Sequence, residues 1–209
     1  MSANPPSVVE SYAEALRYFM GQGSLNRALA HLAADLKDHG IDYVVIGAVA
    51  LLAHGYPRLT EDIDLVFTVE GLNKFHEQLI GLGYASAFPG ARKRLRSTRD
   101  GVRIDVIASG EYPGDGKPKP VRFPNPLEAS VEIDGVRFAT LEKLIELKLA
   151  SGMTAPDRLK DLADVQEMTK IRSLDGEFAD KLNPYVRGKY LELFAAVGRG
   201  RHNNFEEQL

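Results

Sequence analysis

The chain has 209 residues and a formal net charge of −3, with 44% hydrophobic and 26% charged residues. This length supports one large domain or a domain with a helical appendage, and the charge balance excludes a surface that is basic throughout. The absence of cysteine excludes disulfide bonds and thiolate chemistry. No signal-peptide pattern is present, and the longest apolar stretch is too short for a membrane span, so we expect a cytoplasmic protein.

Helical periodicity and short apolar runs alternate through the first half of the chain. They predict helices over 8–20, 26–39, 49–54 and 72–82, and strands over 43–46 and 63–69. Ser24 is the candidate N-cap of the second helix, and Gly40 and Gly83 are the candidate stops of the second and fourth. Residues 1–6, which include two prolines, are typical of a frayed terminus.

The second half begins with strands and ends with helices. Strands are predicted over 92–98, 102–108, 131–133 and 136–138, and each pair flanks a turn that contains Asp-Gly. The run 110–126 is rich in proline and glycine and predicts a loop. Helices are predicted over 141–150, 157–168, 177–182 and 185–197, and we expect the last dozen residues to be loosely structured.

Strands and helices intermix up to about residue 139, and helices dominate afterwards. This pattern predicts an α/β (α+β) fold with a mixed sheet flanked by helices. We expect residues 1–139 to form the core, preceded by two N-terminal helices, and residues 140–209 to form a helical segment packed on it.

Asp62 and Asp64 stand one residue apart at the start of a predicted strand. Aspartate is depleted in strands, so a carboxylate pair there asks for an electrostatic reason. Residues i and i+2 of a strand share one face, with Cα atoms roughly 6.5–7 Å apart. Two like charges held this close suit a divalent cation better than water alone.

Other candidate site residues lie around this pair. Gly47 and Ala48 fall where a strand gives way to a helix, a place where free N–H groups favour a phosphate. Asp105 alternates away from the apolar side of a neighbouring strand, and Arg58 and Thr60 precede the pair at positions able to touch phosphate. Three carboxylates beside such a turn suit two-metal phosphoryl or nucleotidyl transfer.

The run G-A-V-A-L-L-A-H-G-Y-P-R-L-T-E-D-I-D-L, with R-I-D-V-I further on, resembles the nucleotidyltransferase fold of the DNA polymerase β superfamily. The later segments L-E-K-L-I-E-L-K-L-A and D-R-L-K-D-L-A-D-V are similar to the abortive-infection AbiEii group of toxin-like nucleotidyltransferases. This resemblance implies Mg²⁺ or Mn²⁺ as cofactor and an NTP as substrate. It also implies RNA (such as a tRNA 3′ end) or a protein as acceptor, and an antitoxin as partner.

The resemblance also implies roles for individual residues. Gly47 matches the first turn glycine, Asp62 and Asp64 match the metal pair, and Asp105 matches the third carboxylate. Downstream, the residues that fall on the group's lysine and its R-x-K-D-x-x-D helix are Lys148, Arg158, Lys160, Asp161 and Asp164. The departure is Ala48, where the family usually has Ser or Gly, which removes a hydroxyl contact to phosphate but keeps the backbone donor.

Each carboxylate also has a structural interpretation. Asp62 and Asp64 could form a solvated acidic cluster at the start of the strand. Asp105 could pair with Arg103 or Lys93. Gly47 could serve close packing between helix and strand.

The basic residues have alternatives as well. Lys148 could be a surface lysine that covers apolar neighbours with its stem. The helix that follows could carry surface ion pairs, Arg158 with Asp161 and Lys160 with Asp164. The basic run 92–96, continued by Arg99 and Arg103, could be a solvated face, a track for an RNA backbone or a holder for the triphosphate.

Three functions follow from these patterns. The first is a metal-dependent nucleotidyltransferase that modifies a macromolecule, with a role as a toxin. The second is a degenerate fold that serves as a binding or regulatory module, which Ala48 favours. The third is a small-molecule adenylyltransferase of the antibiotic-modifying kind, since a fold does not determine its substrate.

Overall fold

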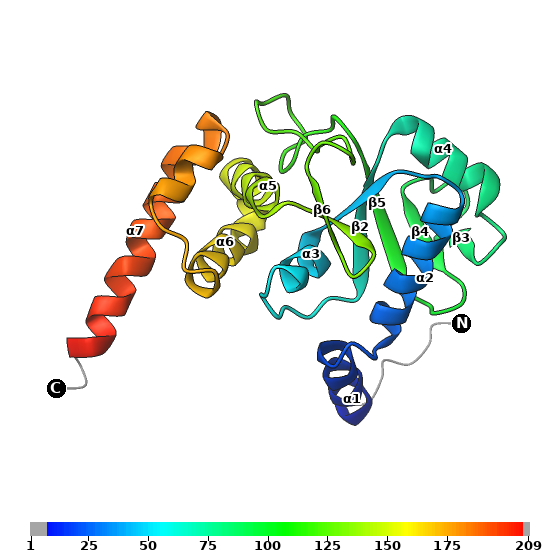
Figure 1. Cartoon of the computed structure of the whole chain (residues 1–209), viewed down its shortest axis with the longest axis horizontal. Coiled ribbons are helices and arrows are strands. Elements are labelled where there is room, and N and C mark those ends of the chain that lie inside the picture. The colour runs from blue at the N-terminus through cyan, green and yellow to red at the C-terminus, as the bar shows by residue number, and fades with distance from the viewer. Residues whose placement is uncertain (1–7, 207–209) are drawn as a thin grey trace.

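The computed structural model of the chain describes residues 8–206, so the predicted frayed terminus at 1–6 lies outside it (Figure 1). Its helices are α1 (Val8–Phe19), α2 (Ser24–Asp38), α3 (Gly47–Ala53), α4 (Val69–Gln78), α5 (Leu141–Thr154), α6 (Leu159–Ile171) and α7 (Pro184–Glu206). Its strands are β1 (Tyr43–Ile46), β2 (Asp62–Phe67), β3 (Tyr84–Ser86), β4 (Arg94–Ser97), β5 (Arg103–Ala108), β6 (Ser130–Ile133) and β7 (Val136–Ala139). Two short 3-10 helices, η1 (Pro156–Arg158) and η2 (Glu177–Lys181), complete the described elements.

The seven strands form one mixed sheet in the order β3-β4-β5-β2-β1-β7-β6. The central pair β1 and β2 is antiparallel, whereas β2 runs parallel to β5 and β1 parallel to β7. Figure 1 shows α5, α6 and α7 grouped at one end of the molecule, with α1, α2 and α4 toward the other. The mixed α/β fold that the sequence predicts is confirmed.

One hydrophobic core joins the sheet to the later helices. Every residue of β1 is buried, and in β2 the buried side chains of Ile63 and Leu65 alternate with the two aspartates. Val165 of α6 and Tyr190 of α7 belong to the same cluster of buried apolar residues as these strands. The helices after the sheet therefore pack as part of one core, which fixes their position relative to β2 and β5.

Two helix boundaries differ from the prediction because capping groups were misplaced. Ser24 is the first residue of α2 rather than its N-cap, and its hydroxyl and N–H both donate to Glu14 at 2.7 Å. Thr68 caps α4 by accepting from the Gly71 N–H, so the chain turns helical at Val69.

The region after α4 holds the largest difference. The predicted helix over 72–82 ends at Gln78, and β3 follows where no strand was predicted. Tyr84 of β3 is fully buried and donates its hydroxyl to Asp35 at 2.6 Å. This tertiary contact draws the segment onto the edge of the sheet.

The C-terminal helix also exceeds its prediction. It begins at Pro184, where a missing N–H has no intrahelical role, and runs to Glu206. The expectation of a loose final dozen residues is therefore wrong up to that point. In the part of the chain that the structure describes, no helix combines the length and the apolar character that a membrane crossing requires.

Candidate active site

A row of side chains crosses four neighbouring strands at the centre of the sheet. Asp64 of β2 lies directly opposite Asp105 of the parallel strand β5. On the outer side Arg94 of β4 lies opposite Asp105, and on the inner side Ile46 of β1 lies opposite Asp64. Directly opposed residues share one face of a sheet, so the register places two carboxylates and an arginine side by side.

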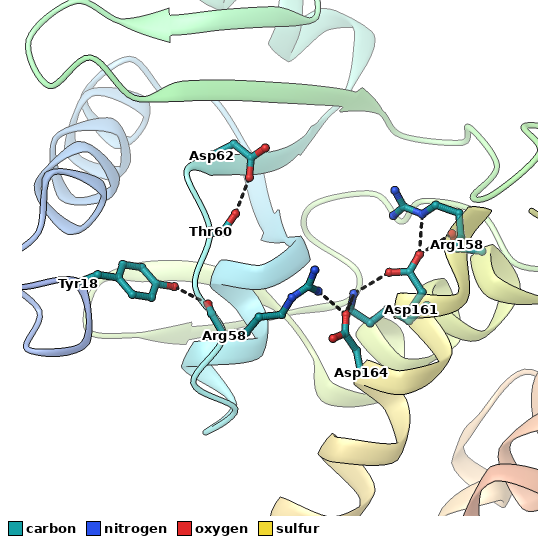
Figure 2. Close-up of polar contacts among 9 residues, drawn as sticks. Tyr18, Arg58, Thr60, Asp62, Arg158, Asp161 and Asp164 are labelled. Carbon is teal, nitrogen blue, oxygen red and sulfur yellow. Dashed lines mark hydrogen bonds and ion pairs between the residues drawn. The ribbon is translucent and has the colours of Figure 1, made fainter. Parts of the chain in front are cut away.

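A second row lies two residues away on the same face. Asp62 is opposite Arg103, which is opposite Arg96. The Thr60 hydroxyl donates to Asp62 at 2.5 Å, and this contact is drawn in Figure 2. The prediction that Asp62 and Asp64 share a face agrees with this alternation along β2.

A cavity of about 630 Å³ opens beside the first row. Small-molecule sites have volumes of about 300–1,000 Å³, so the cavity is of suitable size for a nucleotide. It is lined from the sheet by Gly47, Asp64, Arg94 and Asp105, and from α5, η1 and α6 by Lys148, Ser151, Arg158 and Asp161. Carboxylates of the sheet thus share this cavity with cations of the helices.

Gly47 is required by the carboxylate next to it. Its φ is +68°, in the left-handed region that favours glycine. A Cβ built on Gly47 would overlap the Oδ2 atom of Asp64. The glycine therefore lets Asp64 lie against the turn between β1 and α3, which supports the close-packing interpretation without excluding a role in phosphate binding.

Asp64 is half-buried, and its environment opposes ionisation. Burial, followed by the charges of Asp62 and Asp105, raises its pKa to about 6, and the charges of Lys148 and Arg158 offset this only in part. At Asp64, burial and the neighbouring negative charges therefore outweigh the effect of the neighbouring cations.

The chemistry of the donors fits a hard divalent cation at this point. Asp64 and Asp105 offer carboxylate oxygens side by side, which are ligands that Mg²⁺ and Mn²⁺ accept. Within residues 8–206, however, no three His, Cys, Asp or Glu side chains lie where they could hold one metal ion together. The metal site of three carboxylates remains a prediction, and the pair Asp64 and Asp105 is the part of it that the geometry favours.

Lys148 is buried, with a side chain only 9% exposed, so the interpretation as a surface lysine is wrong. Its ammonium donates to Asp161 Oδ1 at 3.0 Å and to Asp164 Oδ2 at 2.7 Å. Asp161 also accepts from Arg158 at 2.8 Å and from Ser151 at 2.7 Å. The predicted pair between Arg158 and Asp161 is thus present, inside a buried network.

The pKa of Asp161 responds to these partners. Burial raises it, but the charge of Lys148, the hydroxyl of Ser151 and the guanidinium of Arg158 outweigh burial and hold the pKa below its ordinary value. The surroundings of Asp161 therefore favour its charged form, whereas those of Asp64 oppose it.

Arg58 lies outside the cavity and binds a carboxylate of α6. Its Nη1 donates to Asp164 Oδ2, and its backbone oxygen accepts from the Tyr18 hydroxyl at 3.2 Å (Figure 2). Thr60 likewise contacts Asp62 within the protein. The sequence predicted that both side chains could contact a phosphate. In the structure, each side chain contacts an aspartate.

Two further predicted binding residues lie away from the cavity. Ala48 is 7% exposed and packs into the core from α3. Lys160 is exposed on α6, and Asp164, its proposed partner, pairs with Lys148 and Arg58. The binding roles of both residues stay predictions.

The basic run is largely paired or solvated. Lys93 pairs with Glu111, Arg99 with Asp35, and Arg103 approaches Glu61 at 3.5 Å. The proposed partners of Asp105 therefore have other acidic neighbours. Arg94 and Arg96 are exposed on β4, and of these two Arg94 lines the cavity.

Sequence reasoning missed two contributors to the site. Ser151 follows Lys148 by three residues, which places both on the same side of α5, and that spacing is a signal in the sequence. Tyr18 reaches Arg58 across forty residues, and nothing local in the sequence predicts that contact.

No family model and no curated protein sequence matches the chain. Solved structures do. The antibiotic-resistance factor ANT(2″)-Ia in solution matches with a TM-score of 0.51 and 18% identity over 84% of this chain and 96% of that one. ANT(2″)-Ia in complex with adenylyl-2″-tobramycin matches with a TM-score of 0.48 and 19% identity over 86% of this chain and 98% of that one. An antigenic nucleotidyltransferase-like protein from Paracoccidioides brasiliensis matches with a TM-score of 0.45 and 17% identity over 69% of this chain and 74% of that one.

The likeness at a TM-score of 0.51 concerns the fold and covers nearly all of the neighbour. The assignment to the AbiEii group is finer than this likeness reaches and stays a prediction. The chain therefore has the nucleotidyltransferase fold.

Proposed function

We propose that the protein is a divalent-metal-dependent nucleotidyltransferase that transfers a nucleoside monophosphate from an NTP to an acceptor hydroxyl. The observation that carries this proposal is the cavity in which Asp64 and Asp105 share the lining with Lys148 and Arg158. A triphosphate with its metal carries both signs of charge, so it suits a site that is lined by both carboxylates and cations.

The carboxylates and the cations have separate parts in the proposed reaction. Asp64 and Asp105 would hold a divalent cation, which would supply charge neutralisation for the triphosphate and for the pyrophosphate that leaves, and would lower the pKa of the attacking hydroxyl. Lys148 and Arg158 bind phosphate oxygens and hold the NTP in one orientation. Asp161 keeps Lys148 at the cavity wall through their hydrogen bond of 3.0 Å.

For the acceptor we favour a macromolecule, RNA such as a tRNA 3′ end or a protein hydroxyl, with a toxin-like role. The AbiEii resemblance supports this choice. Arg94 supports an anionic acceptor because it extends from the cavity lining onto exposed β4, where Arg96 follows on the same face.

The decisive experiment is label transfer. The purified protein is incubated with each α-labelled NTP, Mg²⁺, and total RNA or cell lysate. We expect labelled product with wild type and a loss of at least about 100-fold in Asp64→Ala, as for other electrostatic groups in catalysis. Asp38→Ala, an exposed change of equal charge at the end of α2, should retain wild-type transfer. Transfer that persists in Asp64→Ala would refute the role of this carboxylate.

A second candidate is adenylylation of a small molecule, which the likeness to ANT(2″)-Ia favours. Intact-mass screening of aminoglycosides and lincosamides with ATP and Mg²⁺ would detect an added AMP. The degenerate alternative is distinguished by calorimetry, since a binding module of that kind would show no Mg²⁺-dependent NTP binding.

A further inference from the structure

Arg58 is connected to the cavity through a single shared oxygen atom. Asp164 Oδ2 accepts from Arg58 and from Lys148 at once (Figure 2). Lys148 and Asp161 line the cavity, whereas Arg58 and Asp164 do not belong to its lining. The chain of direct contacts from Arg58 to the cavity therefore runs through Asp164 to Lys148.

The two carboxylates that hold Lys148 differ in their other partners. Asp161 has Arg158 and Ser151 in addition to Lys148. Asp164, whose side chain is 5% exposed, has Arg58 as its second cationic partner. Without Arg58, the buried charge of Asp164 would be compensated by Lys148 alone, and an unbalanced charge in a poorly solvated place attracts its remaining partner strongly.

That attraction has a direction. Asp161 belongs to the cavity lining and the buried Asp164 does not, so a stronger pull from Asp164 draws the ammonium of Lys148 away from the lining. We infer that Arg58 is a positioning residue, which takes up part of the charge of Asp164 and so keeps Lys148 divided between the two carboxylates and available to a phosphate. The inference rests on the proposed function for the identity of the ligand.

Three variants test the inference: Arg58→Met, Asp164→Asn and the double variant of the two. Lys170→Met is the control, because it removes the same charge at an exposed position of α6. In Arg58→Met we expect the KM for the NTP to rise about tenfold with kcat within about threefold of wild type. In the double variant Asp164 no longer carries the charge that displaces Lys148, so we expect KM to return to within about threefold of wild type.

A purely structural role for Arg58 predicts another pattern. Partial unfolding lowers the amount of active enzyme, so kcat would fall while KM stays unchanged, and the double variant would be no better than Arg58→Met. Either result would overturn the inference. If Arg58→Met does not fold, Arg58→Lys replaces it; lysine retains the charge without the planar fork, so we expect its KM to rise by less than tenfold at unchanged kcat and to return toward wild type when Asp164→Asn is added.

A measurement without nucleotide separates failure of this inference from failure of the proposed function. Two cations that share one oxygen depend on each other, so Arg58→Met and Lys148→Met together should lower Tm by at least about 5 °C more than the sum of the single changes. If both single variants fold and the double variant does not, the combined loss again exceeds the sum of the single losses, as expected. Additive changes in Tm would overturn the shared-oxygen mechanism, whether or not the protein transfers nucleotides.

Discussion

The sheet and the helices each contribute a pair of carboxylates, and the two pairs differ in what surrounds them. Asp161 and Asp164 of α6 each lie beside two cations. Asp64 and Asp105 face each other across β2 and β5, with cations only across the cavity or at the outer strand. The same residue type is thus balanced in one region and left unbalanced in the other.

The pKa values express this difference. That of Asp64 is raised to about 6 by burial and like charges, whereas that of Asp161 is lowered because nearby cations outweigh burial. Burial alone would raise both. The charged form of Asp161 is therefore stabilised by its partners, whereas the charged form of Asp64 carries an electrostatic penalty that a bound cation would relieve.

Removing the central cation of the helical pair should have the largest effect. Lys148→Met deprives two buried carboxylates of a partner, and loss of one member of a buried pair costs about 3–5 kcal/mol. For a chain of this size that is a fall in Tm of about 6–20 °C, measurable by thermal denaturation. A change below about 1 kcal/mol would show that Arg58 and Arg158 compensate both carboxylates by themselves.

Removing the charge of Asp64 should instead stabilise the folded protein. The pKa of Asp64 is about 6 when folded, against an ordinary value of 3.8, so the unfolded chain loses this proton at lower pH than the folded protein does. Wild-type stability therefore falls as pH rises from about 4 to 6, and Asp64→Asn escapes that loss. At pH 8 we expect the variant to be more stable by up to about 3 kcal/mol in metal-free buffer, with no gain below pH 4. Equal pH dependence in urea titrations of the two proteins would contradict this comparison.

Metal addition should cancel the penalty in wild type. At a Mg²⁺ or Mn²⁺ concentration about 100 times its dissociation constant, ligand binding to the folded state alone adds about 2.7 kcal/mol of stability. We expect the rise in Tm with wild type and its loss with Asp64→Asn or with EDTA. A rise of the same size in Asp64→Asn would place the cation elsewhere.

The glycine beside Asp64 offers a steric version of the same test. Gly47→Ala places an alanine in the left-handed region of φ and puts its Cβ in the space of Asp64 Oδ2. We therefore expect the free energy of unfolding to fall by about 2 kcal/mol. In an Asp64→Ala background the overlap with the carboxylate is gone, and the loss should fall to about 1 kcal/mol. An unchanged loss in that background would assign the whole effect to backbone conformation.

The sequence placed Asp64 and Asp105 on the polar side of their strands because that signal is local, although it paired Asp64 with Asp62 and gave Asp105 as a third carboxylate. Alternation along β2 placed Asp64 on the polar face, and the same alternation placed Asp105 on β5. The register that sets the two opposite each other is a tertiary property, yet only the parallel pairing of β2 with β5 was needed to complete it.

The helical pair was harder to predict because its partners come from distant segments. Arg58 and Asp164 are 106 residues apart, and their spacing to nearer charges suggested surface ion pairs or phosphate contacts instead. β3 was missed for the same reason, since its burial depends on the contact of Tyr84 with Asp35 in α2. Local propensity carries no information on such contacts.

Lys160 should give the smallest effect and is the sharpest test of the resemblance against the structure. It is exposed on α6 and lies outside the cavity, so Lys160→Ala should change the free energy of unfolding by less than about 0.5 kcal/mol. For the same reason we expect the affinity for a non-hydrolysable ATP analogue with Mg²⁺ to fall by less than about threefold in calorimetry. A fall of tenfold or more at unchanged stability would mean that the side chain reaches the nucleotide only once it is bound. In that case the helical region would contribute binding contacts beyond its balanced pair.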